Sequence, residues 1–185
     1  MFVELLIRIT RELDKNSIPY MIIGGQAVLL YGEPRLTKDI DITLGVSVDK
    51  LNELLKIIKK IELIPLPSNI KNFTEKTFVL PVKDIKTNIR VDFIFSQTSY
   101  EKQAIKRANP VNLKNAILKF ASIEDLIIHK IFAGRPRDLE DVKTIMIKNP
   151  NFNKKYIKKW LMEFDSSMGE KKLENIFKDM IKNLF

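Results

Sequence analysis

The stretch from Tyr20 to Leu44 constrains the fold more than any other part of the chain. Residues 18–23 are apolar and predict a short buried strand, which leads directly into Gly24 and Gly25. Residues 26–31 are too apolar for an exposed loop, so they predict a helix of about two turns. A glycine turn that opens a helix lets backbone N–H groups approach a ligand closely, and such groups bind anions.

Two carboxylates follow on the next predicted strand, residues 36–44. Because side chains alternate along a strand, Asp39 and Asp41 share one face while Ile40 and Ile42 share the other. Their backbone positions are about 6–7 Å apart, and two like charges at that spacing repel each other unless a cation lies between them. Divalent ions such as Mg²⁺ prefer oxygen ligands of this kind and complete their coordination with substrate phosphates.

A third carboxylate lies on a later predicted strand, residues 89–95. There Val91 and Phe93 share one face, and Arg90 and Asp92 share the other. If this strand neighbours the strand of the acidic pair, the three carboxylates converge. Three carboxylates that hold two Mg²⁺ ions, with Mn²⁺ as an alternative, support in-line displacement at phosphorus.

Four residues near the acidic pair suit the phosphates of a nucleotide. Gly24 and Gly25 form the turn that leads into the N-terminus of a helix, where free N–H groups are available. Arg35 and Thr37 lie just upstream of Asp39 and supply a cation and a hydroxyl group. We therefore expect these four residues to contact phosphate.

The order of these features resembles the DNA polymerase beta-type nucleotidyltransferase superfamily over residues 18–95. The resemblance rests on GGQA, then RLTKDID with thirteen residues between Gly25 and the first aspartate, then VDFI. In that superfamily a GS or GG turn precedes a D-x-D pair, and a later strand supplies the third aspartate. The resemblance implies transfer of a nucleoside monophosphate from an NTP to a hydroxyl group, with release of pyrophosphate. It implies a triphosphate- and metal-binding set made of Gly24, Gly25, Asp39, Asp41 and Asp92.

Two inward-facing charges mark the second half of the chain. A helix is predicted from Ser122 to residue 132, and the next from Pro136 to about residue 147. Lys130 falls within the apolar arc of the first helix and Asp138 within that of the second, with Asp141 at its edge. Inward charges need partners. Either they pair with each other, or they border the nucleotide cleft with Lys130 reaching a phosphate.

Residues 129–142, HKIFAGRPRDLEDV, resemble the minimal AbiEii-like nucleotidyltransferases of prokaryotic toxin–antitoxin systems. This resemblance implies a toxin or antitoxin protein as a partner. The toxins tend to carry a lysine a few residues after the third aspartate, where this chain has FIFSQTS. A module that binds nucleotide or RNA without catalysis, and a partner-binding role in such a pair, are the alternatives to an enzyme.

The predicted architecture is α/β (α+β), a polymerase beta-like core with a mixed sheet flanked by helices. Residues 1–121 are expected to form this core and residues 122–185 a C-terminal helical region. Further elements are predicted from periodicity. They are helices at 2–14, 48–61, 100–107, 153–164 and 169–184, and strands at 73–82 and within 111–121.

Composition limits the partners and the compartment. The net charge of +9 favours RNA, for instance a tRNA end, although a lysine- and isoleucine-rich composition explains it as well. The chain has no cysteine and one histidine, His129, which excludes thiolate and histidine-rich metal sites. Since no apolar run reaches the roughly 18 residues of a membrane span and no signal-peptide pattern is present, we expect a cytoplasmic protein without a membrane partner.

Overall fold

The computed structural model describes residues 1–184, which fall into two compact units. The first unit comprises residues 1–26 and 36–121, and the second comprises residues 27–35 and those from Ser122 onward. The boundary lies inside helix α2 (Gly24–Tyr31), so residues 27–35 group with the C-terminal helices. Phe185, the last residue of the expected C-terminal region, lies outside the described residues.

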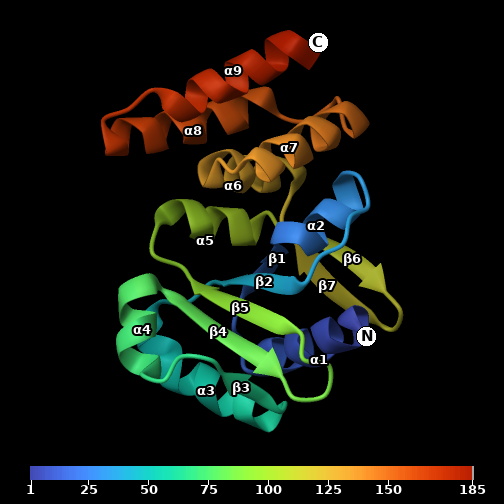
Figure 1. Cartoon of the computed structure of the whole chain (residues 1–185), viewed down its shortest axis with the longest axis vertical. Helices are drawn as coiled ribbons and strands as arrows, with labels where there is room; N and C mark the ends of the chain where they lie inside the picture. Colours follow the sequence, from blue (N-terminus) through green and yellow to red (C-terminus); the bar gives the residue numbers. More distant parts are fainter. Residues whose placement is uncertain (185) are drawn as a thin grey trace. The chain divides into compact units, whose positions relative to one another are not determined.

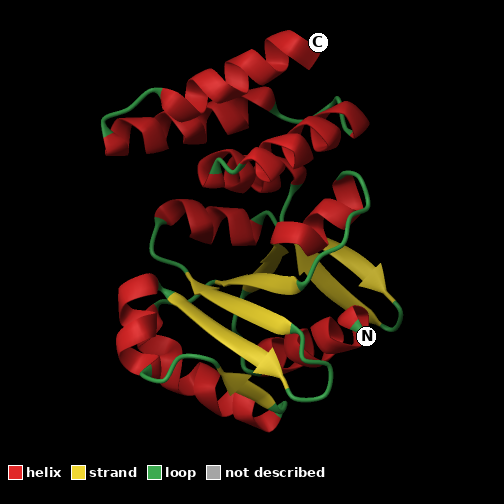
Figure 2. Cartoon of the chain, in the orientation of Figure 1, coloured by secondary structure: helices red, strands yellow, loops and turns green. Residues whose placement is uncertain are grey.

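The first unit contains a mixed seven-stranded sheet among the described residues (Figures 1 and 2). Its strands are β1 Tyr20–Ile23, β2 Asp39–Leu44, β3 Leu63–Pro65, β4 Val79–Asp84, β5 Arg90–Phe95, β6 Asn109–Leu113 and β7 Ala116–Phe120. Their order across the sheet is β3-β4-β5-β2-β1-β7-β6. Strand β2 pairs antiparallel with β1 and parallel with β5, which places the two acidic strands side by side at the centre of the sheet.

Helices pack on this sheet through the apolar arcs that the sequence shows. They are α1 Phe2–Lys15, α3 Leu51–Lys60 with the short 3-10 turn η1 Val48–Lys50 before it, α4 Ile70–Thr77 and α5 Ser99–Lys106. Ile40, Val91 and Phe93 are fully buried in the core of the first unit, on the face opposite the aspartates. Helix α5 packs over β1 and β2 (Figure 1). The predicted mixed sheet with flanking helices is confirmed.

Three local predictions for this unit are wrong. Residues 73–77 belong to helix α4 rather than to a strand, because the Asn69 side chain accepts the Asn72 N–H and caps a helix there. The region of residues 109–120 forms a hairpin of two strands instead of one, with Lys114 at a φ of 53° in its turn. Helix α2 begins at Gly24 rather than at residue 26, so the glycine pair is its first turn.

The second unit is helical, with α6 Ile123–Ala133, α7 Pro136–Lys148, α8 Lys154–Met168 and α9 Lys172–Leu184. The predicted ends of α6 are confirmed. The Ser122 hydroxyl accepts the Asp125 N–H at 3.1 Å, and Gly134 ends the helix at a φ of 64°. Within residues 1–184, no helix combines the length and the apolar character that crossing a bilayer requires.

Candidate active site

The acidic residues of strands β2 and β5 lie opposite one another. The parallel register pairs Asp41 with Asp92 and Asp39 with Arg90. Paired residues of neighbouring strands point to the same face, and their strands are about 4.8 Å apart. Strand pairing therefore places all three aspartates on one face of the sheet, in the first unit. This is the arrangement on which the metal-site hypothesis depends.

Arg90 completes this group, and the sequence did not identify it as a site residue. Its Nε donates to Oδ1 of Asp92 at 2.8 Å. That hydrogen bond raises the pKa of Arg90, partial burial opposes the rise, and the charges of Asp92, Asp39 and Asp41 add to it. The only available signal was the alternation of β5, which puts Arg90 and Asp92 on one face. Asp39, Asp41, Asp92 and Arg90 thus share one face of the sheet, as three anions and one cation.

Gly24 permits a close approach between helix α2 and Asp41. Its φ is +64°, a conformation that side chains disfavour. A Cβ atom at this position would lie 1.9 Å from Oδ2 and 2.8 Å from Cγ of Asp41. The carboxylate therefore lies directly against the first residue of the helix, where the helix dipole favours negative charge.

Thr37 lies near the same turn but already has a partner. Its hydroxyl accepts a hydrogen bond from Nε2 of Gln26 at 2.8 Å, and both side chains are buried. This contact ties the end of the α2–β2 connection to the first turn of α2. A contact between Thr37 and phosphate stays a prediction. Gln26 gave no signal in the sequence beyond its place after the glycine pair.

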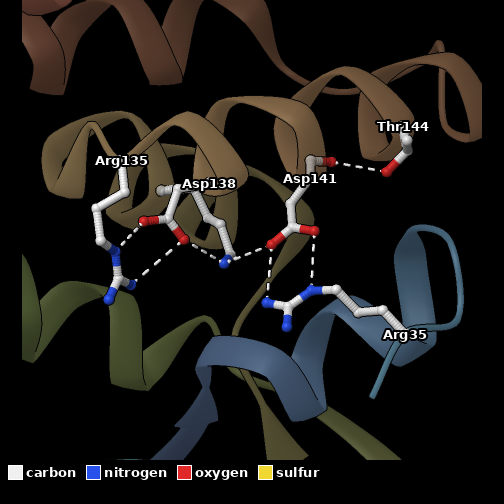
Figure 3. A network of polar contacts seen from close by, with 6 residues as sticks. Arg35, Arg135, Asp138, Asp141 and Thr144 are labelled. Atoms are coloured by element: carbon white, nitrogen blue, oxygen red, sulfur yellow. Dashed lines mark hydrogen bonds and ion pairs between the residues drawn. The ribbon is translucent and has the colours of Figure 1, made fainter. Parts of the chain in front are cut away.

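The inward charges of the second unit form one network (Figure 3). Lys130 Nζ lies 2.6 Å from Oδ1 of Asp138 and 2.7 Å from Oδ2 of Asp141. Arg35 donates to both oxygens of Asp141, at 3.0 and 2.9 Å, and Arg135 donates to Asp138. Lys130 and Asp138 thus pair with each other, which is the first of the two possibilities that the sequence left open. Their binding of nucleotide stays a prediction, as does that of Arg35.

The same network makes the stability of the second unit depend on pH. Burial raises the pKa of Asp138, but the hydrogen bonds from Arg135 and Lys130 outweigh it and lower the net pKa below the usual value. A lowered folded pKa stabilises the fold above the unfolded value of about 3.9. This stabilisation is lost as the pH falls through the folded pKa.

We therefore expect the free energy of unfolding to fall as the pH drops below about 4, where the unfolded carboxyl begins to bind protons. In urea titrations between pH 7 and pH 2.5, Asp138→Asn should be less stable than the wild type at pH 7 and should lose less stability on acidification. An identical pH dependence in both proteins would contradict a role for Asp138 in this linkage.

The aspartates of the first unit fit a divalent metal ion in their chemistry. They are hard oxygen donors on one face of the sheet, and Asp92 already pairs with the cation of Arg90. Within residues 1–184, no group of three or more acidic or histidine side chains is already gathered as a metal site. Asp39, Asp41 and Asp92 would hold such an ion, and Arg90 would then share Asp92 with it.

The fold belongs to a known class. The structure is similar to that of ANT(2″)-Ia in complex with adenylyl-2″-tobramycin, with a TM-score of 0.54, 16% identity, and 99% of this chain and 98% of that chain covered. The structure is also similar to that of an antigenic nucleotidyltransferase-like protein from Paracoccidioides brasiliensis. Here the TM-score is 0.56 and the identity 16%, and the match covers 94% of this chain and 91% of that chain. A third similar structure is lincomycin-bound LnuA, a lincosamide antibiotic adenylyltransferase. Its TM-score is 0.50 and its identity 14%, and the match covers 72% of this chain and 89% of that chain. At these identities the likeness shows a nucleotidyltransferase fold.

The family is shown by a separate comparison. The chain belongs to the family described as nucleotidyltransferase of unknown function (DUF6036), whose model matches residues 3–184. No curated protein sequence matches the chain. The predicted polymerase beta-like fold and the nucleotidyltransferase class are confirmed.

Proposed function

We propose that this protein transfers a nucleoside monophosphate from an NTP to a hydroxyl group, with Mg²⁺ held by Asp39, Asp41 and Asp92. The observation that supports the proposal most is the register of β2 and β5, which pairs Asp41 with Asp92 on the face that also carries Asp39. Family membership supports the reaction class. A bound divalent ion would supply the positive charge that activates a hydroxyl and neutralises a triphosphate.

The proposal assigns a role in the reaction to the glycine pair and to Asp92 of the first unit. The first N–H groups of α2, at Gly24 and Gly25, bind phosphate oxygens. Asp92 helps to activate the acceptor hydroxyl, because it would hold a divalent ion together with Asp41, its neighbour across the two strands. In the reaction a bond forms between the acceptor oxygen and the α-phosphorus. The bond from that phosphorus to the bridging oxygen breaks, and pyrophosphate leaves.

For the acceptor, we propose a hydroxyl group of RNA or of a protein, within an AbiEii-like toxin–antitoxin pair. The chain-wide charge of +9 supports RNA. Two solved structures of the same fold are an adenylyltransferase for lincosamide antibiotics and a complex with adenylylated tobramycin, so small molecules belong in the test as well.

The experiment is incubation with each α-³²P-labelled NTP and Mg²⁺, in parallel with total RNA, total cell protein, and a mixture of tobramycin and lincomycin. We expect label in the RNA or protein fraction, and none when the metal is chelated. Label in the antibiotics alone would overturn the proposed acceptor while supporting the reaction. No label in any fraction, with no pyrophosphate released, would contradict the reaction itself.

Gly24→Ala is expected to lower transfer about a hundredfold, because the new methyl group displaces the Asp41 carboxylate by an ångström or more. Gly169→Ala is a matched control. Gly169 has a similar φ of +69° but no atom within 4 Å of its Cβ position. Both variants therefore share the strain of a positive φ, and only Gly24→Ala should lose activity beyond its loss of stability. Equal activity in the two variants would contradict the role of Gly24.

A further inference from the structure

The acidic face of the sheet continues beyond the aspartates into a basic row. The antiparallel register of β4 and β5 pairs Lys83 with Arg90, and the parallel register of β5 and β2 pairs Arg90 with Asp39. These three residues therefore form one row on one face of the sheet. We propose that Lys83 and Arg90 bind the last phosphodiester group of an RNA acceptor and thereby place its 3′ hydroxyl beside the aspartates. The inference rests on the proposed function, because it names the acceptor of the same site.

The two cations are an unfavourable pair in the free protein. Residues directly opposite on antiparallel strands have Cβ atoms about 5 Å apart, and like charges there destabilise the pairing. Arg90 holds Asp92 through its Nε, and within residues 1–184 its two terminal nitrogens have no hydrogen-bond partner. Asp92, the diagonal neighbour of Lys83, is thus already paired. An anion bound between the two cations would relieve their repulsion.

The other carboxylates near Lys83 in the sequence and the register are also paired. Asp84 follows Lys83 on β4, but its side chain is fully buried and pairs with Arg8. Glu62, just before β3, lies 2.5 Å from Lys86. Within the described residues, Lys83 makes no ion pair and no side-chain hydrogen bond. Its positive charge is therefore available to a ligand.

This end of the acidic face is open to solvent. Strand β3 pairs Ile64 with Lys83, so Ile64 extends the same row. Ile64 is 52% exposed and the Arg90 side chain 54% exposed, and Lys83 is exposed as well. A ligand can reach both cations without displacing a packed side chain, and Ile64 offers apolar surface to a sugar or a base.

The position of the two cations suits the acceptor rather than the NTP. Strand β1 and the start of α2 lie on one side of β2, and β5 and β4 lie on the other. Gly24 lies against Asp41, which puts the proposed triphosphate site on the β1 side. Lys83 is two strand spacings, about 10 Å, from Asp39 on the other side. In phosphoryl transfer the attacking and leaving oxygens are roughly in line, so the acceptor enters opposite the leaving pyrophosphate.

An acceptor that fits this row carries an anion close to its hydroxyl group. The last nucleotide of an RNA has a phosphate one sugar away from its 3′ hydroxyl, and arginine and lysine are the usual partners of such phosphates. A serine or tyrosine hydroxyl of a protein carries no such anion. The amino groups of an aminoglycoside would be repelled by the same two cations.

The test measures the affinity for a short oligouridylate with a 5′ fluorescein label, by anisotropy, with Mg²⁺ and without NTP. One ligand has only natural phosphates, and the other has a neutral methylphosphonate at its last linkage. The wild type should bind the neutral ligand about tenfold more weakly, because charge-assisted hydrogen bonds are lost. In Lys83→Gln this ratio should fall to about threefold, since Arg90 alone remains. Its thermal stability should be unchanged or higher, because a repelling charge is removed.

The control is Lys59→Gln, at an exposed position of α3 whose lysine makes no ion pair within the described residues. It should discriminate between the two ligands as the wild type does. Equal discrimination in Lys83→Gln and in the control would overturn the proposal, as would no binding of RNA. So would an equal loss of affinity when the neutral linkage is the first one, because the contact would then not lie at the 3′ end. Since no NTP is present, none of these results contradicts the transfer reaction, which label in protein or antibiotic would still support.

Discussion

Asp41→Asn is expected to lower nucleotidyl transfer about a thousandfold, which corresponds to roughly 4 kcal/mol of transition-state stabilisation. Asparagine has the same size, so it keeps the contact with Gly24 and the cross-strand place opposite Asp92. It lacks the negative charge that holds a divalent ion and its bound triphosphate. The loss should appear in the rate of α-³²P transfer at saturating NTP.

The fold of this variant should be intact, because one of three neighbouring like charges is removed. Thermal unfolding should show a stability close to that of the wild type, because relief of this repulsion offsets the loss of attraction to Arg90 and to the helix dipole. Asp179→Asn is the matched control, since Asp179 is an exposed carboxylate on α9. It should transfer label at the wild-type rate. A folded Asp41→Asn protein with full activity would remove Asp41 from the catalytic set.

Lys130→Met is expected to destabilise the second unit by about 3 kcal/mol. Lys130 is 5% exposed and bridges two buried carboxylates, Asp138 and Asp141. The methionine fills the space of the lysine stem but leaves two anions without the charge between them. The loss stays moderate because Arg135 and Arg35 each keep one aspartate partner. Urea unfolding at pH 7 measures it.

The control for this change is Lys143→Met, at an exposed position of the same helix pair. Equal stability of the two variants would contradict the structural role of Lys130. The affinity of each folded variant for an NTP, measured well below the unfolding midpoint, separates the two interpretations of Lys130. A phosphate ligand would lose affinity in Lys130→Met alone, and a purely structural lysine would not.

The sequence predicts on which face of the sheet the acidic residues lie, but it does not predict which residues lie next to them on the neighbouring strand. Alternation along a strand has a period of two, so the shared face of Asp39 and Asp41 follows from local pattern alone. The pairing of Asp41 with Asp92 depends on strand order, which no local pattern contains. The alternation of β5 therefore predicts the face of Arg90, but only the strand pairing shows that Arg90 lies next to the acidic residues.

The buried charges of the second unit also have partners that the sequence does not predict, because one of them is far away along the chain. The apolar arcs predicted that Lys130 and Asp138 need partners, and the structure supplies them within eight residues. Arg35 joins the network from 106 residues before Asp141, a separation that sequence periodicity cannot bridge. The β-prone residues from Phe73 onward predict a strand, but the Asn69 cap begins helix α4 just before them, and residues 73–77 are helical.

Parallel assays with α-³²P- and γ-³²P-labelled NTP test the central claim most directly. We expect label to reach the acceptor from the α position only, with pyrophosphate released in equal amount, a requirement for a divalent ion, and loss of transfer in Asp41→Asn. Transfer of the γ label, or α transfer that survives replacement of Asp39, Asp41 and Asp92 together by asparagine, would contradict it.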